Sequence, residues 1–194
     1  MNFKILIFSF AFSCVAIGAS SQHLAVKNNL LYSGLAVPNL GLEMALGKHF
    51  SADFSGAYNP FKLSDDKQLD FWYVQPEIKY WFMQKYAGSY IGFHTFGGKY
   101  DIGGVSGKLD FAGLSCVDLS GMKDYRYDGK MLGAGMSFGH YWILSPHWGI
   151  EASLGVGYAH LKYNCGESDS KLGLFISDYF GPTKAGINLV YLIK

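Results

Sequence analysis

Apolar and polar residues alternate along much of this chain. The clearest stretch is residues 148–163, WGIEASLGVGYAHLKY, where one set of alternate positions includes Ile150, Leu154 and Val156. The other set holds Glu151, a serine and three glycines. Successive side chains of a β-strand point to opposite faces, whereas a helix would scatter these positions around its surface. The pattern predicts a strand with one apolar face and one small or polar face.

The same period of two residues recurs in seven other segments. After residue 22, no segment reaches the ~18 consecutive apolar residues of a transmembrane helix. The predicted strands are mostly close to ten residues long, which suits tilted strands that cross a bilayer. They lie at 24–33, 39–47, 50–58, 71–82, 89–99, 130–144, 148–163 and 183–193. The sequence therefore predicts an all-β fold: an eight-stranded antiparallel up-and-down β-barrel of the transmembrane, outer-membrane type.

The connections between these strands alternate in length. Short turns are predicted at 47–49, 83–88 and 145–147, and long loops at 59–70, 100–129 and 164–182, while the first connection is intermediate. Ten of the eleven aspartates lie in or beside the long loops. Short turns at one rim and long, solvated loops at the other are typical of outer-membrane barrels.

A lipocalin is the main alternative, because lipocalins are also secreted and eight-stranded. The outer face of a lipocalin must be charged, but here the face opposite the apolar one carries mostly glycine, serine and asparagine. Aromatic residues also gather near strand ends, as in interfacial girdles; they include Trp72, Tyr80, Trp81, Phe82, Tyr141, Trp142 and Trp148. Both features favour the membrane barrel.

The first residues resemble a secretory signal peptide. Lys4 supplies a positive charge, residues 5–16 are apolar, and small residues follow at 18–21. We therefore expect a cleaved signal peptide at 1–21 and a single barrel domain at 22–194. This organisation implies Sec-type export and a place in the outer membrane of a Gram-negative cell.

Two cysteines, Cys116 and Cys165, remain after the predicted cleavage. They fall in two of the long loops, where an oxidising compartment allows either a disulfide or two free thiols. The chain has no CxxC motif and no third cysteine in the mature part, so we expect no zinc or other metal site.

The face opposite the apolar one carries seven ionisable residues, four acids and three lysines. An eight-stranded barrel has an interior just wide enough for side chains, and buried charges need partners. We therefore predict a salt-bridged plug and not an open pore. Its members are Lys27, Glu43, Asp53, Glu77, Lys79, Glu151 and Lys184.

Several function classes find little support in the residues. The net charge is +1 and Arg126 is the only arginine, which argues against nucleic-acid or phosphate recognition. The chain shows no hydrolase, P-loop or dinucleotide motif in a suitable context, and the glycine-rich segment 133–139 lies within a predicted strand. We expect no catalytic residues and no cofactor.

The histidines are the candidate residues for an alternative function, in which the barrel is a lipid-modifying or hydrolytic enzyme. Such an enzyme would need a histidine or serine with a carboxylate at one rim. By alternation, His140 and His160 lie on the lipid side near the rims, and His94 points inward. An interfacial or hydrogen-bonded interior histidine explains these positions more simply than catalysis does.

The segment 184–194, KAGINLVYLIK, continues the alternation. Lys184, Gly186, Leu189 and Tyr191 match the pattern that the outer-membrane barrel-assembly machinery reads, although three further residues follow. We expect this strand to pair with the first one, because an open sheet edge in lipid is too costly.

Several longer blocks resemble one family. They are VKNNLLYSGLAVPNLGLEMALGKHFSADFSGAYNPF (26–61), VQPEIKYWF (74–82), GFHTFGGKYDIGG (92–104), SLGVGYAHLKYNCG (153–166) and YFGPTKAGINLVYLIK (179–194). Together they are similar to the Bacteroidetes proteins catalogued as domain of unknown function 3575. The resemblance implies a small outer-membrane barrel with an envelope role near surface fimbriae and OmpA-type proteins. It implies no established activity and supplies no catalytic residues.

The sequence as a whole thus predicts a non-enzymatic envelope protein, either structural or surface-binding. Its partners would be outer-membrane lipid, the assembly machinery during biogenesis and an envelope or surface protein reached through the long loops. A narrow pore is a further alternative, which the nearly balanced interior charges argue against.

Overall fold

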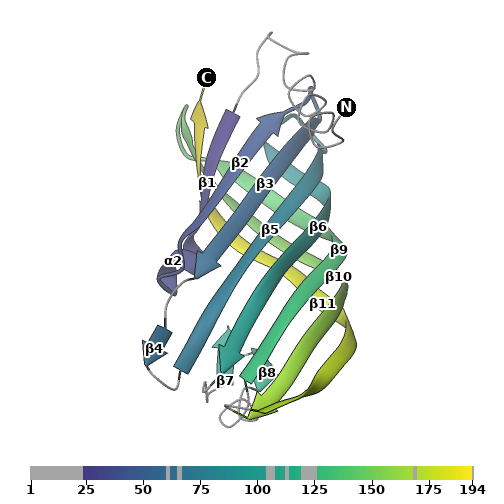
Figure 1. Ribbon diagram of the computed structural model, residues 1–194. Coiled ribbons are helices and arrows are strands. Elements are labelled where there is room, and N and C mark those ends of the chain that lie inside the picture. Colours follow the sequence, from purple (N-terminus) through teal and green to yellow (C-terminus); the bar gives the residue numbers. More distant parts are fainter. Residues whose placement is uncertain are drawn as a thin grey trace, which may run out of the picture.

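A computed structural model describes residues 24–59, 62–64, 67–103, 108–111, 114–118, 126–167 and 170–193. The predicted signal peptide, 1–21, lies outside these residues. Eight antiparallel strands form a closed ring in sequence order (Figure 1). They are β1 (Leu24–Asn29), β2 (Asn39–Ala45), β3 (Phe50–Asn59), β5 (Lys67–Trp81), β6 (Gly88–Gly103), β9 (Arg126–Ile143), β10 (Trp148–Glu167) and β11 (Ser170–Ile193).

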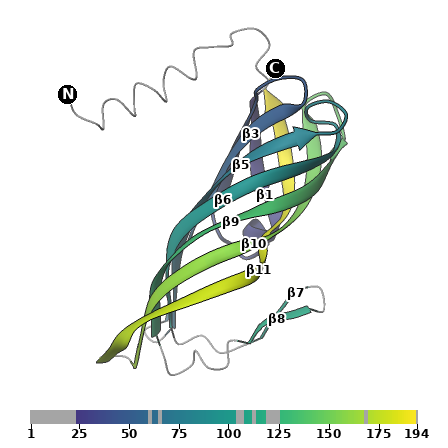
Figure 2. The same cartoon turned by 90° about the vertical axis from the view of Figure 1, so that its right-hand side faces the viewer.

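The ring closes because the first and last strands pair with each other. Leu24 lies opposite Ile193 and Asn29 opposite Asn188, and β3 pairs directly with β5. The remaining elements are α2 (Leu30–Gly34), β4 (Lys62–Ser64), β7 (Lys108–Phe111) and β8 (Leu114–Asp118). These four elements lie toward one end of the ring, and the short turns lie at the other (Figures 1 and 2). We call these the α2 end and the short-turn end.

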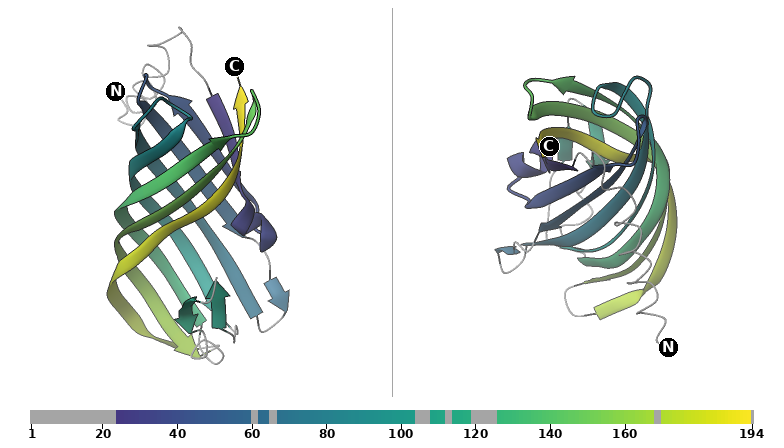
Figure 3. Two further views of the ribbon diagram at one scale, coloured as in Figure 1. Left: turned by 180° about the vertical axis from the view of Figure 1, so that it is seen from behind. Right: turned by 90° about the horizontal axis from the view of Figure 1, so that it is seen from above.

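The strands on one side of the ring are short, and those on the other side are long. β1, β2 and β3 contain 6, 7 and 10 residues, whereas β5, β6, β9, β10 and β11 contain 15, 16, 18, 20 and 24. Views from behind and from above show the long strands curving around one side (Figure 3). The extra length lies at the α2 end.

The bounds of the first strand and of the long loops differ from the sequence expectations. The first strand stops at Asn29 and not at 33, because the Asn29 side chain accepts a hydrogen bond from the backbone N–H of Leu31 and caps the short helix α2. The segment 164–182, expected to be a long loop, is mostly a continuation of the β10–β11 hairpin, with Tyr163 opposite Phe175. Backbone pairing continues through this segment, and its apolar residues Phe175, Ile176 and Phe180 are exposed on the extended hairpin.

The loops expected at 59–70 and 100–129 are also shorter than predicted. β5 begins at Lys67, β6 runs to Gly103 and β9 begins at Arg126. Between β6 and β9 in the sequence, the short hairpin β7–β8 forms a separate two-stranded sheet.

Alternation along the strands separates an apolar exterior from a polar interior. On β10, Leu154 and Val156 are 71% and 57% exposed, whereas Glu151 and Ser153 are 1% and 3% exposed. Glycines at inward positions make room for large interior side chains. A Cβ added at Gly139 would overlap the Tyr90 ring, which explains the glycine-rich part of β9.

Within the residues that the structure describes, none of the helices is long and apolar enough to span a membrane.

Candidate functional site

The polar interior of the ring brings together all seven ionisable residues predicted to face inward, here called the ion network. Lys27 Nζ lies 2.8 Å from Glu43 Oε2, 2.6 Å from Asp53 Oδ2 and 2.8 Å from Glu151 Oε1. Lys79 Nζ contacts the same three carboxylates at 2.8, 3.0 and 3.0 Å. Two ammonium groups, from β1 and β5, are thus shared among three acids from three other strands, β2, β3 and β10.

Glu77 and Lys184 form the second part of the ion network. Lys184 donates to Glu77, Ser137 donates to the same carboxylate, and Lys79 Nζ lies 3.9 Å away. Apart from Lys184, the side chains of the network are at most 4% exposed. Charges buried this deeply are tolerated only with partners, which the network supplies from both sides of the ring.

Neutral groups complete the coordination of two of the acids. Ser51 Oγ donates to Glu43 at 2.5 Å and accepts from Trp81 Nε1 at 2.8 Å. Tyr90 OH donates to Glu151 at 3.0 Å, and its ring lies 4.5 Å from Lys79 Nζ, within cation–π range. The network is therefore tied to the aromatic residues beside it.

An aromatic plug fills the short-turn end of the ring. Trp81, Tyr86, Tyr90 and Tyr141 pack together, with ring centroids 4.7 Å apart for Trp81–Tyr90 and 6.2 Å apart for Trp81–Tyr141. The expectation that Trp81 and Tyr141 belong to an interfacial girdle is wrong, since both are almost fully buried inside. Alternation from Lys79 to Trp81 already carried this signal, because positions two apart on a strand share a face.

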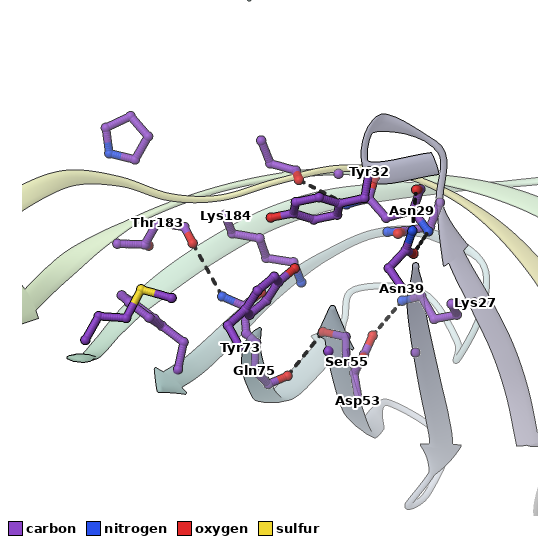
Figure 4. Close-up of a pocket in the computed structure, with 18 of the residues that line it drawn as sticks. Lys27, Asn29, Tyr32, Asn39, Asp53, Ser55, Tyr73, Gln75, Thr183 and Lys184 are labelled. Carbon is purple, nitrogen blue, oxygen red and sulfur yellow. Dashed lines mark hydrogen bonds and ion pairs between the residues drawn. The ribbon is translucent and has the colours of Figure 1, made fainter. Parts of the chain in front are cut away.

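A cavity of about 420 Å³ occupies the α2 end of the interior (Figure 4). All eight ring strands and α2 contribute to its lining. Lys27, Asp53 and Lys184 lie at its polar side, and Tyr32 and Tyr73 face each other with centroids 5.7 Å apart. Sequence reasoning missed this cavity, because its existence depends on side-chain volumes summed over eight strands.

The histidines occupy the faces that alternation predicts. His94 is fully buried, and its Nε2 lies 2.9 Å from Thr183 Oγ1. His140 Nδ1 lies 2.8 Å from Ser89 Oγ near the short-turn end. His160 Nδ1 lies 2.7 Å from Asp178 Oδ1 toward the α2 end.

The serine–histidine pair and the histidine–carboxylate pair do not form a single triad. On β9, His140 is eight residues from Leu132, the partner of His160, which is ~26 Å at ~3.3 Å per residue. Among the described residues, no group of His, Cys, Asp or Glu is arranged to hold a metal ion.

The remaining predicted residues are distributed as follows. Cys116 lies in β8 and Cys165 in β10, but their side chains are outside the part of the chain that the structure describes, so their disulfide stays a prediction. In β11, Gly186 faces the interior beside Lys184, whereas Tyr191 is exposed and packs against Trp148 at 4.9 Å between centroids. Leu189 is half-buried on the same face as Tyr191.

Comparison with protein families gives one match. The model of a family described as "Protein of unknown function (DUF3575)" matches residues 5–193, nearly the whole chain. The chain belongs to this family. No curated protein and no solved structure matches it. Membership of the DUF3575 family agrees with the resemblance noted in the sequence and carries no activity with it.

Proposed function

We propose that this DUF3575 protein is a non-enzymatic outer-membrane β-barrel with a closed interior, exported by a signal peptide at 1–21, with a structural or surface-binding role in the cell envelope. The observation that carries the proposal is the inverted arrangement of its two faces. Charged side chains are buried inside the ring, and large apolar side chains cover its outside. A ring in water would need the opposite arrangement, because soluble proteins rarely expose apolar patches beyond a few hundred Å².

The height of the apolar band suits a bilayer. On β9 the exposed outward side chains include Leu132, Met136, Phe138 and Trp142. From the first to the last of these the strand covers ~33 Å at ~3.3 Å per residue. At the ~40° tilt usual for such strands, this corresponds to an apolar band ~25 Å tall, the height found in outer-membrane barrels.

Aromatic residues border this band at the short-turn end. Phe50 and Tyr80 have centroids 5.2 Å apart, and Tyr80 and Phe82 have centroids 6.0 Å apart. Trp148 and Tyr191 form a similar pair further around the ring. Exposed aromatic clusters of this kind are typical of the boundary between lipid and water.

The proposal assigns the two ends of the ring to different compartments. Outer-membrane barrels have short turns on the periplasmic side and longer connections outside. The α2 end would therefore face the cell exterior, together with the taller strands β9, β10 and β11. These extensions and the connections between them are the parts available to an envelope or surface partner.

A matched pair of substitutions on one strand tests membrane insertion. Phe138→Arg places a charge at mid-band, where arginine costs ~2–4 kcal/mol, and Asp128→Arg places it on the same face beyond the band. We expect Phe138→Arg to reduce the membrane-embedded, heat-modifiable protein strongly and Asp128→Arg to leave it unchanged. Equal insertion of both variants would refute a lipid-facing band.

The barrel-assembly machinery is tested at β11. The double substitution Leu189→Asp and Tyr191→Asp removes the apolar positions of the proposed assembly signal, so we expect the protein to accumulate in the periplasm. Gly47→Asp, at an exposed short turn where an added side chain meets no neighbour within 4 Å, serves as the control for added charge. Normal insertion of the double variant would remove the assembly-signal proposal.

A further inference from the structure

The acid Asp53 has one oxygen that the ion network leaves unsatisfied. Lys27 and Lys79 both contact Asp53 Oδ2, at 2.6 and 3.0 Å. The other oxygen, Oδ1, is buried and has no hydrogen-bond partner among the described residues. Asp53 as a whole is 4% exposed, and it lines the cavity at the α2 end. A buried carboxylate oxygen without a donor is costly, so a donor from the cavity would stabilise it.

The charges around the cavity favour a donor that carries a positive charge. The ion network holds four carboxylates and three ammonium groups, which leaves one negative charge without compensation. His94 does not restore the balance, because its Nδ1 has no hydrogen-bond acceptor among the described residues to hold a second proton. Lys27 and Lys184 are already paired with acids, so an anion would find no free partner in them.

The opposite wall of the cavity suits an apolar or aromatic body. Tyr32 from α2 and Tyr73 from β5 present rings 5.7 Å apart, inclined at 46°, and Phe96 adds a third ring. Aromatic faces attract organic cations as well as apolar groups. Figure 4 shows the tyrosines on one side of the cavity and Lys27 and Asp53 on another.

Glycine keeps the space beside Asp53 open. A Cβ added at Gly41 would lie 3.8 Å from Asp53 Oδ1 and 3.2 Å from Lys27 Cβ. Gly41 itself lines the cavity. At about 420 Å³ the cavity falls within the range of small-molecule sites, ~300–1,000 Å³.

We infer that this cavity binds a small organic ammonium compound, whose charged group donates to Asp53 Oδ1 and whose body lies against Tyr32 and Tyr73. The inference goes beyond the envelope role proposed above and does not require membrane insertion. The ion network then has two tasks: it closes the ring interior and it provides the anionic floor of the site.

Calorimetric titration of the whole purified protein in detergent micelles tests this inference, with the heat of titration into protein-free micelles subtracted. Three probes share one aromatic body: phenethylammonium, phenethyl alcohol and 3-phenylpropionate. We expect the ammonium probe to bind about tenfold or more tightly than the alcohol, and the carboxylate to bind most weakly. Equal affinity for ammonium and alcohol, preference for the carboxylate, or no binding of any probe would overturn the inference.

Two substitutions of matched charge localise the interaction. Asp53→Asn and Glu77→Gln each remove one carboxylate from the ion network, but only Asp53 lines the cavity. We expect Asp53→Asn to abolish the preference for ammonium over alcohol and Glu77→Gln to retain most of it. Retention of the preference in folded Asp53→Asn would contradict the assignment. If that variant does not fold, the order of the three probes on the unmodified protein decides the question.

Discussion

The two halves of the ring interior differ in how completely side chains fill them. At the short-turn end, Trp81, Tyr90 and Tyr141 are at most 2% exposed and close the interior as an aromatic plug. At the α2 end, smaller or more widely separated side chains leave a cavity of about 420 Å³. The ion network lies between the two halves. Its Glu151 accepts a hydrogen bond from Tyr90 of the aromatic plug, and its Asp53 lines the cavity.

This difference predicts that the ring is more rigid at the short-turn end than at the α2 end. The aromatic plug derives its stability from close packing, which tolerates little change in volume. At the cavity end the lining side chains leave unfilled space, so added volume that enters this space should cost less than at the plug. Variants at both ends and in the ion network between them probe this contrast.

The largest effect is expected at Lys79. Lys79→Met removes an ammonium group that contacts Glu43, Asp53 and Glu151, so the carboxylates lose a buried counter-charge, at a cost of about 3–5 kcal/mol. Urea unfolding in detergent measures the change in the free energy of unfolding. Lys48→Met, at an exposed turn, is the control and should stay within about 0.5 kcal/mol. Similar stability of the two variants would show that the network contributes little.

Substitution of one glycine at each end of the ring tests the difference in packing between the aromatic plug and the cavity. Gly139→Ala adds a methyl group that overlaps the buried Tyr90 ring, so we expect a loss of about 1–3 kcal/mol. Gly186→Ala, at the cavity wall, places its methyl group 3.2 Å from the side-chain ends of Asn29 and Ser153, without overlap, and should cost less. Thermal unfolding of both variants compares the two ends directly. A larger cost for Gly186→Ala would reverse the assignment of the rigid end.

A smaller effect is expected where the aromatic plug meets the ion network. Tyr90→Phe keeps the ring but removes the donor to Glu151. Glu151 retains contacts with Lys27, Lys79 and Asn188, so the loss should be near the low end for a charged hydrogen bond, about 1.5 kcal/mol. Urea unfolding against the unmodified protein gives the value. A loss as large as that of Lys79→Met would mean that Glu151 depends on the Tyr90 hydroxyl as strongly as on its ammonium partners.

The smallest effect is expected in the current that the protein conducts across a planar bilayer. Because the aromatic plug closes the short-turn end, the protein in a planar bilayer should give no stable, large single-channel current. Trp81→Ala, which empties the centre of the plug, provides the comparison and should raise the frequency of opening events. A large steady current from the unmodified protein would show that the cavity continues through the ring.

Much of this architecture follows from local alternation. The two-residue period identified the faces of the strands, and the same parity placed Lys27, Glu77 and Glu151 inside, because burial on one face determines which alternate positions can be polar. The extension of β10 and β11 was not predicted, because the glycine, serine and aspartate residues within 164–182 are typical of loops and obscure its apolar positions, such as Leu174 and Ile176. The helix α2 was also not predicted, because its five residues are too few to show a helical period and follow directly after the alternating strand β1.

The interior sites show a second limit of sequence reasoning. Alternation shows that Asp53 and Tyr73 face inward, but not that they border the same cavity or that Asp53 Oδ1 lacks a donor. Those facts depend on the stagger of the strands around the ring and on side-chain volumes contributed by every strand. Trp81 and Tyr141 were misassigned for a related reason, since an aromatic residue near a strand end suits either a girdle or a plug.

The short strand β1 gives the ring a preferred place to open. β1 forms four residue pairs with β2 and six with β11, whereas β9 and β10 share eighteen. Lys27, on β1, is held from within by Glu43 on β2, Asp53 on β3 and Glu151 on β10. One ammonium group thus acts as a non-covalent cross-link over the seam with the fewest paired residues in the ring, and detachment of β1 would break all three of these contacts.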